Sequence, residues 1–155
     1  LVSTLEAYFQ GKKDLFGGLA MERWEKDWES YLVLHIDFSL TKYMELTDLT
    51  GQLNLFLHRW EKIYGKDEAE KTASERLQGI ILRASEQIGK QVVVLIDEYD
   101  APLLDSNSDT ALQQQLRNEM RKFFSPPQEV GAVSSLSLHH RHQQVQPTEH
   151  LQRTE

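Results

Sequence analysis

The sequence predicts an α/β fold, in which a parallel sheet is flanked by helices. Two compact apolar segments, residues 32–38 and 91–96, have the composition of strands, and segments with helical apolar spacing lie before, between and after them. The second segment is a continuous β-branched run, which is typical of a strand that helices cover on both faces. The resulting order of helix, strand, two helices, strand and helix is the alternation that produces a parallel sheet.

The first predicted helices are marked by apolar spacing and by the glycines that end them. Residues 4–10 have helical spacing and stop at Gly11, because glycine readily adopts the left-handed conformation that closes a helix. The run at 32–38 then ends in a polar exit, as a buried strand does. Residues 49–64 place leucines and aromatic residues on one face and stop at Gly65, which predicts an amphipathic helix.

Two further helices bracket the second strand. Thr72 and Glu75 have the spacing of a capping box, and Gly89 supplies a stop, so a helix is predicted between Thr72 and Gly89. After the second strand, an amphipathic helix closes at Ser125, which precedes two prolines. The inward positions of this last helix are Leu112, Leu116, Met120 and Phe123.

Carboxylates follow the second strand directly. Ile96 is succeeded by Asp97, Glu98 and, one residue further on, Asp100. Ligands of open parallel sheets bind at the carboxyl ends of the strands, where an Asp can hold Mg²⁺ and an adjacent Glu can polarise an attacking water. Four apolar β-formers followed by Asp-Glu form the Walker B pattern, which assigns Asp97 to the metal of a nucleotide and Glu98 to the general base. The spacing alone is equally compatible with a solvated turn.

The complementary half of such a site is missing from the sequence. A phosphate-binding loop needs Gly, four residues, then Gly-Lys-Ser/Thr, so that backbone amides and a lysine cradle the phosphates. The 155 residues contain no such string, and the Gly-Lys pairs that begin at Gly11, Gly65 and Gly89 do not continue with Ser or Thr. We therefore expect weak nucleotide binding unless Mg²⁺ and another chain supply the missing donors.

Three stretches of the chain carry a family resemblance. Residues 1–20 (LVSTLEAYFQGKKDLFGGLA), 92–105 (VVVLIDEYDAPLLD) and 116–126 (LRNEMRKFFSP) resemble, in this order, the AAA-ATPase-like family abundant in anaerobic gut bacteria, a branch of the P-loop NTPases. The resemblance covers residues 1–126. In that family the segment similar to residues 1–10 follows a Gly-Lys-Ser phosphate loop, and a nuclease-like domain often lies beyond the ATPase.

This resemblance implies a nucleotide-binding ancestry. It implies ATP and Mg²⁺ as ligands, with Asp97 and Glu98 as Walker B residues. It also implies an incomplete P-loop NTPase-like sheet in residues 1–126, because the phosphate loop is absent. We expect this fragment to be inactive as an ATPase by itself, and to hold no cofactor if binding is too weak.

Residues 127–155 are predicted to be a disordered tail. Most histidines of the chain lie from residue 134 onward, and this stretch shows no apolar period. The group His139, His140 and His142 has the composition of a metal site, but adjacent histidines point apart and no scaffold holds them. We therefore expect no metal site there.

The tail is also compatible with a shifted reading frame. Sliding the codon frame from Leu138 onward allows a string that resembles the next strand and loop of the family. The hypothesis is a frameshift between about residues 125 and 137, which leaves the tail unselected and removes a core strand. The sheet would then have unpaired edges, which invite self-association, and marginal stability.

Composition excludes several classes of function. A net charge of −7 and a pI near 5.4 argue against binding to nucleic acid or to anionic lipid. The absence of Cys excludes disulfides and thiolate sites and fits a reducing cytosol. No apolar run approaches the roughly 18 residues of a membrane span, and the start lacks the layout of a signal peptide, so we expect a cytoplasmic protein. Because Leu1 is not Met, we expect it to be a processed end or a cut in a longer reading frame.

Two other functions remain open at this point. Asp97, Glu98 and Asp100 could form a two-metal phosphodiesterase or nuclease site, which needs no phosphate loop. The helix at residues 49–64 could instead make the chain a non-catalytic interaction module. The hydrolase alternative predicts metal-dependent phosphodiester cleavage that is lost in Asp97→Asn. The interaction alternative predicts that the apolar stripe of that helix is exposed.

Overall fold

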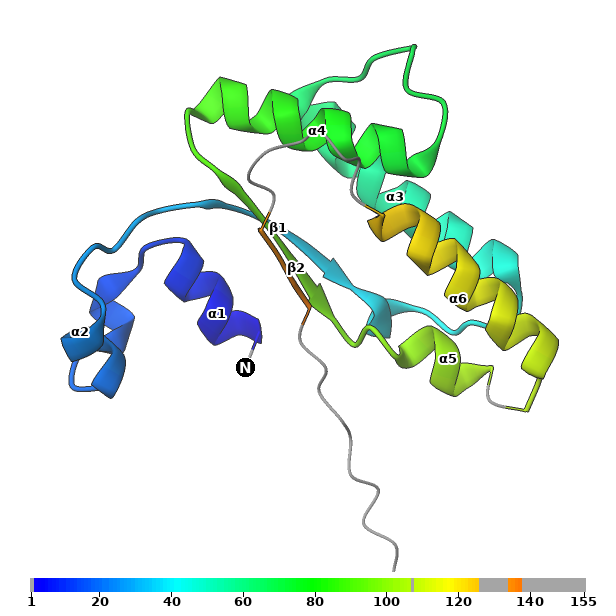
Figure 1. Cartoon of the computed structure of the whole chain (residues 1–155), viewed down its shortest axis with the longest axis horizontal. Coiled ribbons are helices and arrows are strands. Elements are labelled where there is room, and N and C mark those ends of the chain that lie inside the picture. Colours follow the sequence, from blue (N-terminus) through cyan, green and yellow to red (C-terminus); the bar gives the residue numbers. More distant parts are fainter. Residues whose placement is uncertain (1, 107, 126–133, 138–155) are drawn as a thin grey trace, which may run out of the picture.

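A three-stranded parallel sheet organises the chain, in the strand order β1-β2-β3 (Figure 1). The computed structural model describes residues 2–106, 108–125 and 134–137. The strands are β1 (Leu32–Asp37), β2 (Val92–Asp97) and β3 (Ser134–Ser137), and the helices are α1 (Val2–Phe9), α2 (Ala20–Trp24), α3 (Leu46–Tyr64), α4 (Ala73–Ile88), α5 (Ala101–Asp105) and α6 (Thr110–Phe124). Two short 3₁₀ helices are η1 (Lys13–Phe16) and η2 (Phe38–Leu40). The α/β class predicted from the sequence is confirmed.

The strands β1 and β2 pair without offset. Leu32 lies opposite Val92, and the register continues residue by residue to Asp37 opposite Asp97. Five successive residues of β2 are buried, as expected for a strand that helices cover on both faces. The carboxyl ends of β1 and β2 are therefore level with each other.

A third strand lies within the stretch that the sequence predicts as a tail. Ser134–Ser137 pair in parallel with residues 93–96 of β2 and add a short strand to the sheet. Periodicity could not reveal β3, because a parallel ladder is made by backbone groups whatever the side chains are. The rest of the predicted tail, with its histidines and its proposed shift of frame, lies outside the described residues.

The larger core lies on the face of the sheet that α3, α4 and α6 cover (Figure 1). The strands contribute alternate residues to it, since successive side chains of a strand point to opposite faces. These residues are Leu34 and Ile36 of β1, with Val92, Val94 and Ile96 of β2. The apolar stripe of α3 packs into the same core through Leu49, Leu53, Phe56 and Leu57.

The opposite face of the sheet is covered by α1. Val2 packs with Val93 and Leu95 in a second, smaller cluster. The carbonyl of Phe9 accepts a hydrogen bond from the amide of Tyr31 at 2.7 Å, which puts the end of α1 beside the beginning of β1. The helix therefore runs antiparallel to the strands, and its first turn points toward their carboxyl ends (Figure 1).

The helix boundaries follow local capping chemistry. The predicted capping box of α4 is confirmed, since the amide of Glu75 donates to the Thr72 hydroxyl at 3.2 Å and the amide of Thr72 donates to the Glu75 carboxylate at 2.8 Å. The helix predicted at residues 49–64 begins earlier, at Leu46, because Glu45 and Asp48 form a further capping box. The helix at residues 4–10 begins at Val2 and ends at Phe9.

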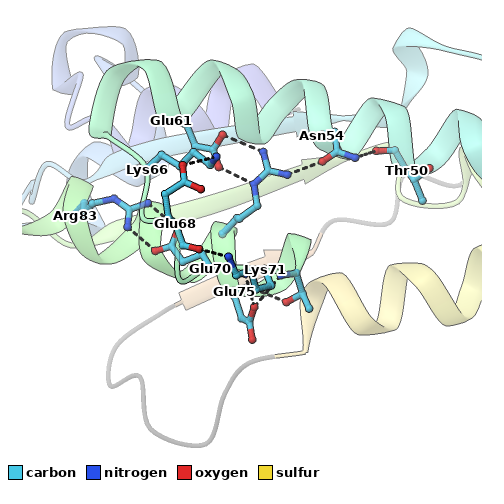
Figure 2. A network of polar contacts seen from close by, with 11 residues as sticks. Thr50, Asn54, Glu61, Lys66, Glu68, Glu70, Lys71, Glu75 and Arg83 are labelled. Atoms are coloured by element: carbon cyan, nitrogen blue, oxygen red, sulfur yellow. Dashed lines mark hydrogen bonds and ion pairs between the residues drawn. The ribbon is translucent and has the colours of Figure 1, made fainter.

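A polar network joins α3 to α4 (Figure 2). Arg76 donates from Nε and Nη2 to the two carboxylate oxygens of the buried Glu61, at 2.6 and 3.0 Å, and from Nη1 to Asn54 at 2.6 Å. These hydrogen bonds hold the pKa of Glu61 below its ordinary value and raise the pKa of Arg76. A second ion pair links Arg83 of α4 to Glu70 in the α3–α4 connection. The two helices are thus fixed by paired charges at one side of the core.

Two helical glycines allow a matched test of this network. A Cβ at Gly51 would meet no atom within 4 Å, whereas a Cβ at Gly79 would overlap the carboxylate of Glu70 that binds Arg83. Gly51→Ala should raise the free energy of unfolding by about 1 kcal/mol, because alanine is the better helix former. Gly79→Ala should not raise the free energy of unfolding and should lower it by up to about 1 kcal/mol, because the Arg83–Glu70 ion pair must move. Urea denaturation measures the free energy of unfolding of both variants. If Gly79→Ala raised stability equally in the original chain and in the Glu70→Ala variant, the proposed clash would be contradicted.

The Glu61–Arg76 pair should make stability depend on pH in the acid range. Because the folded-state pKa of Glu61 is lowered, its contribution is present above the ordinary value of 4.5 and is lost as the pH falls through the lower value. Glu61→Gln should cost about 2 kcal/mol at pH 7, since Arg76 loses a largely buried partner, and should flatten the loss of stability below pH 4.5. The control Glu68→Gln, in an exposed pair with Lys66, should change neither quantity. Equal effects of the two variants would contradict this assignment.

Candidate functional site

The carboxyl end of the sheet brings together two aspartates. Asp37 ends β1 and Asp97 ends β2, and they are register partners in adjacent strands, whose backbones lie about 4.8 Å apart. Asp97 is predicted from the sequence as a site residue, whereas Asp37 is not. The available signal was the same pattern in both strands, an apolar run that ends in Asp.

Both aspartates belong to the face of the sheet that α1 covers. Leu95 packs against Val2 of α1, and Asp97 follows it by two residues on the same face. The carboxylates of Asp37 and Asp97 each accept one backbone hydrogen bond, from Ser39 at 2.8 Å and from Glu98 at 3.0 Å. The first turn of α1 points toward this end of the sheet, so this turn and the aspartates lie on the same face.

Glu98 has an unusual backbone conformation. Its φ is +51°, and among the described residues no other non-glycine residue has a positive φ. The left-handed region costs an L-residue such as glutamate about 1 kcal/mol. Residues held in such conformations cluster at functional sites. The strain therefore falls on the residue that the Walker B pattern assigns to the general base, a role that stays a prediction.

Further acidic groups surround this end of the sheet. Asp105 accepts hydrogen bonds from Lys42 at 3.1 Å and from the amide of Tyr43 at 3.2 Å. The Tyr43 hydroxyl is buried and donates to the carbonyl of Phe38 at 2.9 Å. Burial raises the pKa of Tyr43, and the negative charges of Asp105, Asp37 and Asp48 raise it further. The neighbourhood is therefore negative and favours a cation.

The carboxylates do not form a ready-made metal cage. Among the described residues, no group of three or more His, Cys, Asp or Glu is arranged to hold a metal ion. A Mg²⁺ ion at Asp97 would therefore keep water or phosphate oxygens as its other ligands, which is how Mg²⁺ is usually bound beside nucleotides. The same observation argues against the two-metal hydrolase, which needs Asp97, Glu98 and Asp100 to converge.

The interaction-module hypothesis fails its own criterion. Its proposed binding surface was the apolar stripe of the helix at residues 49–64. In α3 the stripe residues Leu49, Leu53, Phe56 and Leu57 are buried, and Trp60 and Tyr64 are partly buried against the same core. The stripe packs in the core of this domain and is not available to a partner.

The architecture is an α/β fold with a parallel sheet, in which the strands β1 and β2 both end in an aspartate. Residues 1–136 match the AAA-ATPase-like family, whose description is "Predicted AAA-ATPase". The chain therefore belongs to the AAA-ATPase-like family. The matched range includes most of β3.

One relative and two negative findings complete the comparison. An "Uncharacterized protein in vnfD 5'region" of Azotobacter chroococcum mcd 1 is 32% identical over 126 residues, which are 80% of this chain and 24% of that protein. The chain thus spans about a quarter of the length of this relative. No solved structure matches the chain. In the part of the chain that the structure describes, no helix has the length and apolar character needed to cross a membrane.

The strain at Glu98 predicts an unusual stability effect. Glu98→Gly should raise the free energy of unfolding by up to about 1 kcal/mol, because glycine adopts a positive φ without a steric cost. Asp100→Gly is the matched control, since Asp100 has a φ of −88° and should lose about 0.5 to 1 kcal/mol. Urea denaturation measures both variants. Equal destabilisation by the two would show that the Glu98 side chain serves the fold and that the strain is not costly.

Proposed function

We propose that this chain supplies the acidic, Walker B half of an ATP-hydrolysing site. In this proposal Asp97 binds the Mg²⁺ of the nucleotide and Glu98 accepts a proton from the attacking water. The observation that carries the proposal is the level pairing of Asp37 with Asp97 at the carboxyl ends of two parallel strands. Membership of the AAA-ATPase-like family supports it.

Each residue has a separate task in this proposal. Asp97 holds the cation through the carboxylate oxygen that the Glu98 amide leaves free, and Asp37 adds negative charge beside it. Bound Mg²⁺ would neutralise phosphate charge and polarise the γ-phosphate. Glu98 projects from the turn after β2, where an ionised carboxylate can orient a water molecule and take its proton. The strained backbone is consistent with a side chain whose direction matters more than local stability.

The negative charge of the acidic strand ends opposes the binding of a triphosphate. A triphosphate brings several negative charges to an edge that already carries Asp37, Asp97 and Glu98. The 155 residues contain no Gly-Lys-Ser/Thr string to hold the β- and γ-phosphates. We therefore propose that these 155 residues alone bind ATP weakly and do not turn it over.

The cation half of the proposal can be tested with Mn²⁺ as a paramagnetic substitute for Mg²⁺. In amide NMR spectra of the chain, Mn²⁺ should broaden the signals of residues 37–39 and 97–99 first. Asp97→Asn should weaken this effect about tenfold, because the main charged ligand is lost. Asp100→Asn is the control and should leave it unchanged. Equal loss in the two variants, together with metal-dependent cleavage of a phosphodiester, would favour the two-metal hydrolase instead.

The same samples test the nucleotide half of the proposal. Calorimetric titration with Mg²⁺ and ATP should detect no micromolar affinity, and phosphate release should not exceed the background. Turnover of ATP that stops in Glu98→Gln would overturn the proposed dependence on donors from outside these 155 residues. Mn²⁺ broadening without tight ATP binding is the result that supports both halves.

A further inference from the structure

A polar cavity lies at the opposite end of the sheet from the acidic strand ends. It has a volume of about 260 Å³ and is lined by Tyr8, Glu25, Asp27, Trp28, Glu29 and Tyr31. Tyr31 directly precedes β1, whereas Asp37 ends it, so the length of the strand, about 20 Å, separates this cavity from the acidic strand ends. The two sites are therefore distinct.

Aromatic rings fixed by the core form part of the cavity wall. The rings of Tyr8 and Trp28 meet edge to face with centroids 5.7 Å apart, and both contact Phe16, which is almost fully buried. The ring of Tyr31 packs edge to face on Phe9 at 5.8 Å. Because these rings are held by their neighbours, the cavity does not depend on mobile side chains for its shape.

The cavity is strongly negative. Tyr8 donates a hydrogen bond to Glu25 at 2.6 Å, and Tyr31 donates one to Glu29 at 2.8 Å. The Tyr8 hydrogen bond lowers the pKa of Glu25, and the two carboxylates raise the pKa values of the two tyrosines. The described residues that line the cavity include no Lys, Arg or His to balance the three carboxylates.

Hydrogen bonds within the described part of the chain use only some of the carboxylate oxygens of the cavity. One oxygen of Glu29 and one of Glu25 bind the tyrosines, and the second oxygen of Glu25 accepts from the amide of Asp27 at 3.2 Å. The second oxygen of Glu29 and both side-chain oxygens of Asp27 receive no hydrogen bond from the described part of the chain. These three acceptors and the ring faces are available to a ligand.

The spacing of the acids excludes a small ion as the best ligand. The three carboxylates are not gathered into a metal-holding group among the described residues. A guanidinium group is broader and planar, donates to two carboxylates at once and stacks on aromatic rings. An ammonium group is more strongly hydrated and offers no flat face.

We propose that the cavity formed by Tyr8, Trp28, Tyr31 and the acids Glu25, Asp27 and Glu29 binds a guanidinium group. The group belongs either to a small molecule of the arginine type or to an arginine side chain of a partner protein. This inference is independent of the proposed ATPase site, because no residue is shared between them.

The binding test uses the full 155-residue chain and N-acetyl-arginine amide as the probe. The probe should shift the Trp28 indole signal and the amide signals of residues 25–31, and it should bind at least about threefold more tightly than N-acetyl-lysine amide. Combined Asp27→Asn and Glu29→Gln should weaken binding about tenfold, since two charges are removed. Asp14→Asn, an exposed acid in η1 outside the cavity, is the control and should leave the affinity unchanged.

Further comparisons identify the source of the guanidinium group and test the proposal. Tighter binding of an acetylated Gly-Arg-Gly amide than of free arginine indicates a partner's side chain, and the reverse order indicates a small molecule. No signal shift with either probe up to about 10 mM would overturn the proposal. So would equal responses to the arginine probe, the lysine probe and Ca²⁺, or an equal loss of affinity in Asp14→Asn.

Discussion

The in-register parallel pairing of β1 with β2 is the constraint on which the rest of the structure depends. Five consecutive residues of β2 are buried, so both faces of the strand must be covered, and the chain places α1 on one face and α3, α4 and α6 on the other. Burial of each such aliphatic side chain contributes about 1.5 to 3 kcal/mol. A slip of one residue would turn this apolar set away from its helices. The register that protects the core also sets Asp37 level with Asp97.

The two ends of this sheet concentrate negative charge in different ways. At the carboxyl end, Asp37 and Asp97 come from two strands and each accepts a backbone hydrogen bond, while Lys42 pairs with the nearby Asp105. At the amino end, the acids flank aromatic rings that are anchored in the core. Like charges held together cost stability unless a cation joins them, which is the physical basis of the two proposed cation sites.

The predictions that succeeded rest on local signals. The capping box of Thr72 and Glu75 and the buried run of β2 each lie within a few residues of sequence, and the physics that forms them acts over the same range. The helix at residues 49–64 was placed correctly but begun too late, because a Glu at the N-cap was not recognised. The strand β3 was missed, because three of its four residues are serine and serine gives no apolar period.

The sequence by itself determined the α/β class, the acidic ending of β2 and the lack of a Gly-Lys-Ser/Thr string. Tertiary structure alone decided that Asp97 has Asp37 as its neighbour, that Glu61 forms an ion pair with Arg76, and that aromatic rings and acids around Trp28 line a cavity. Each of these contacts joins residues far apart in the chain. Their positions depend on strand register and helix packing, which are properties of the whole core and leave no mark in a short stretch of sequence.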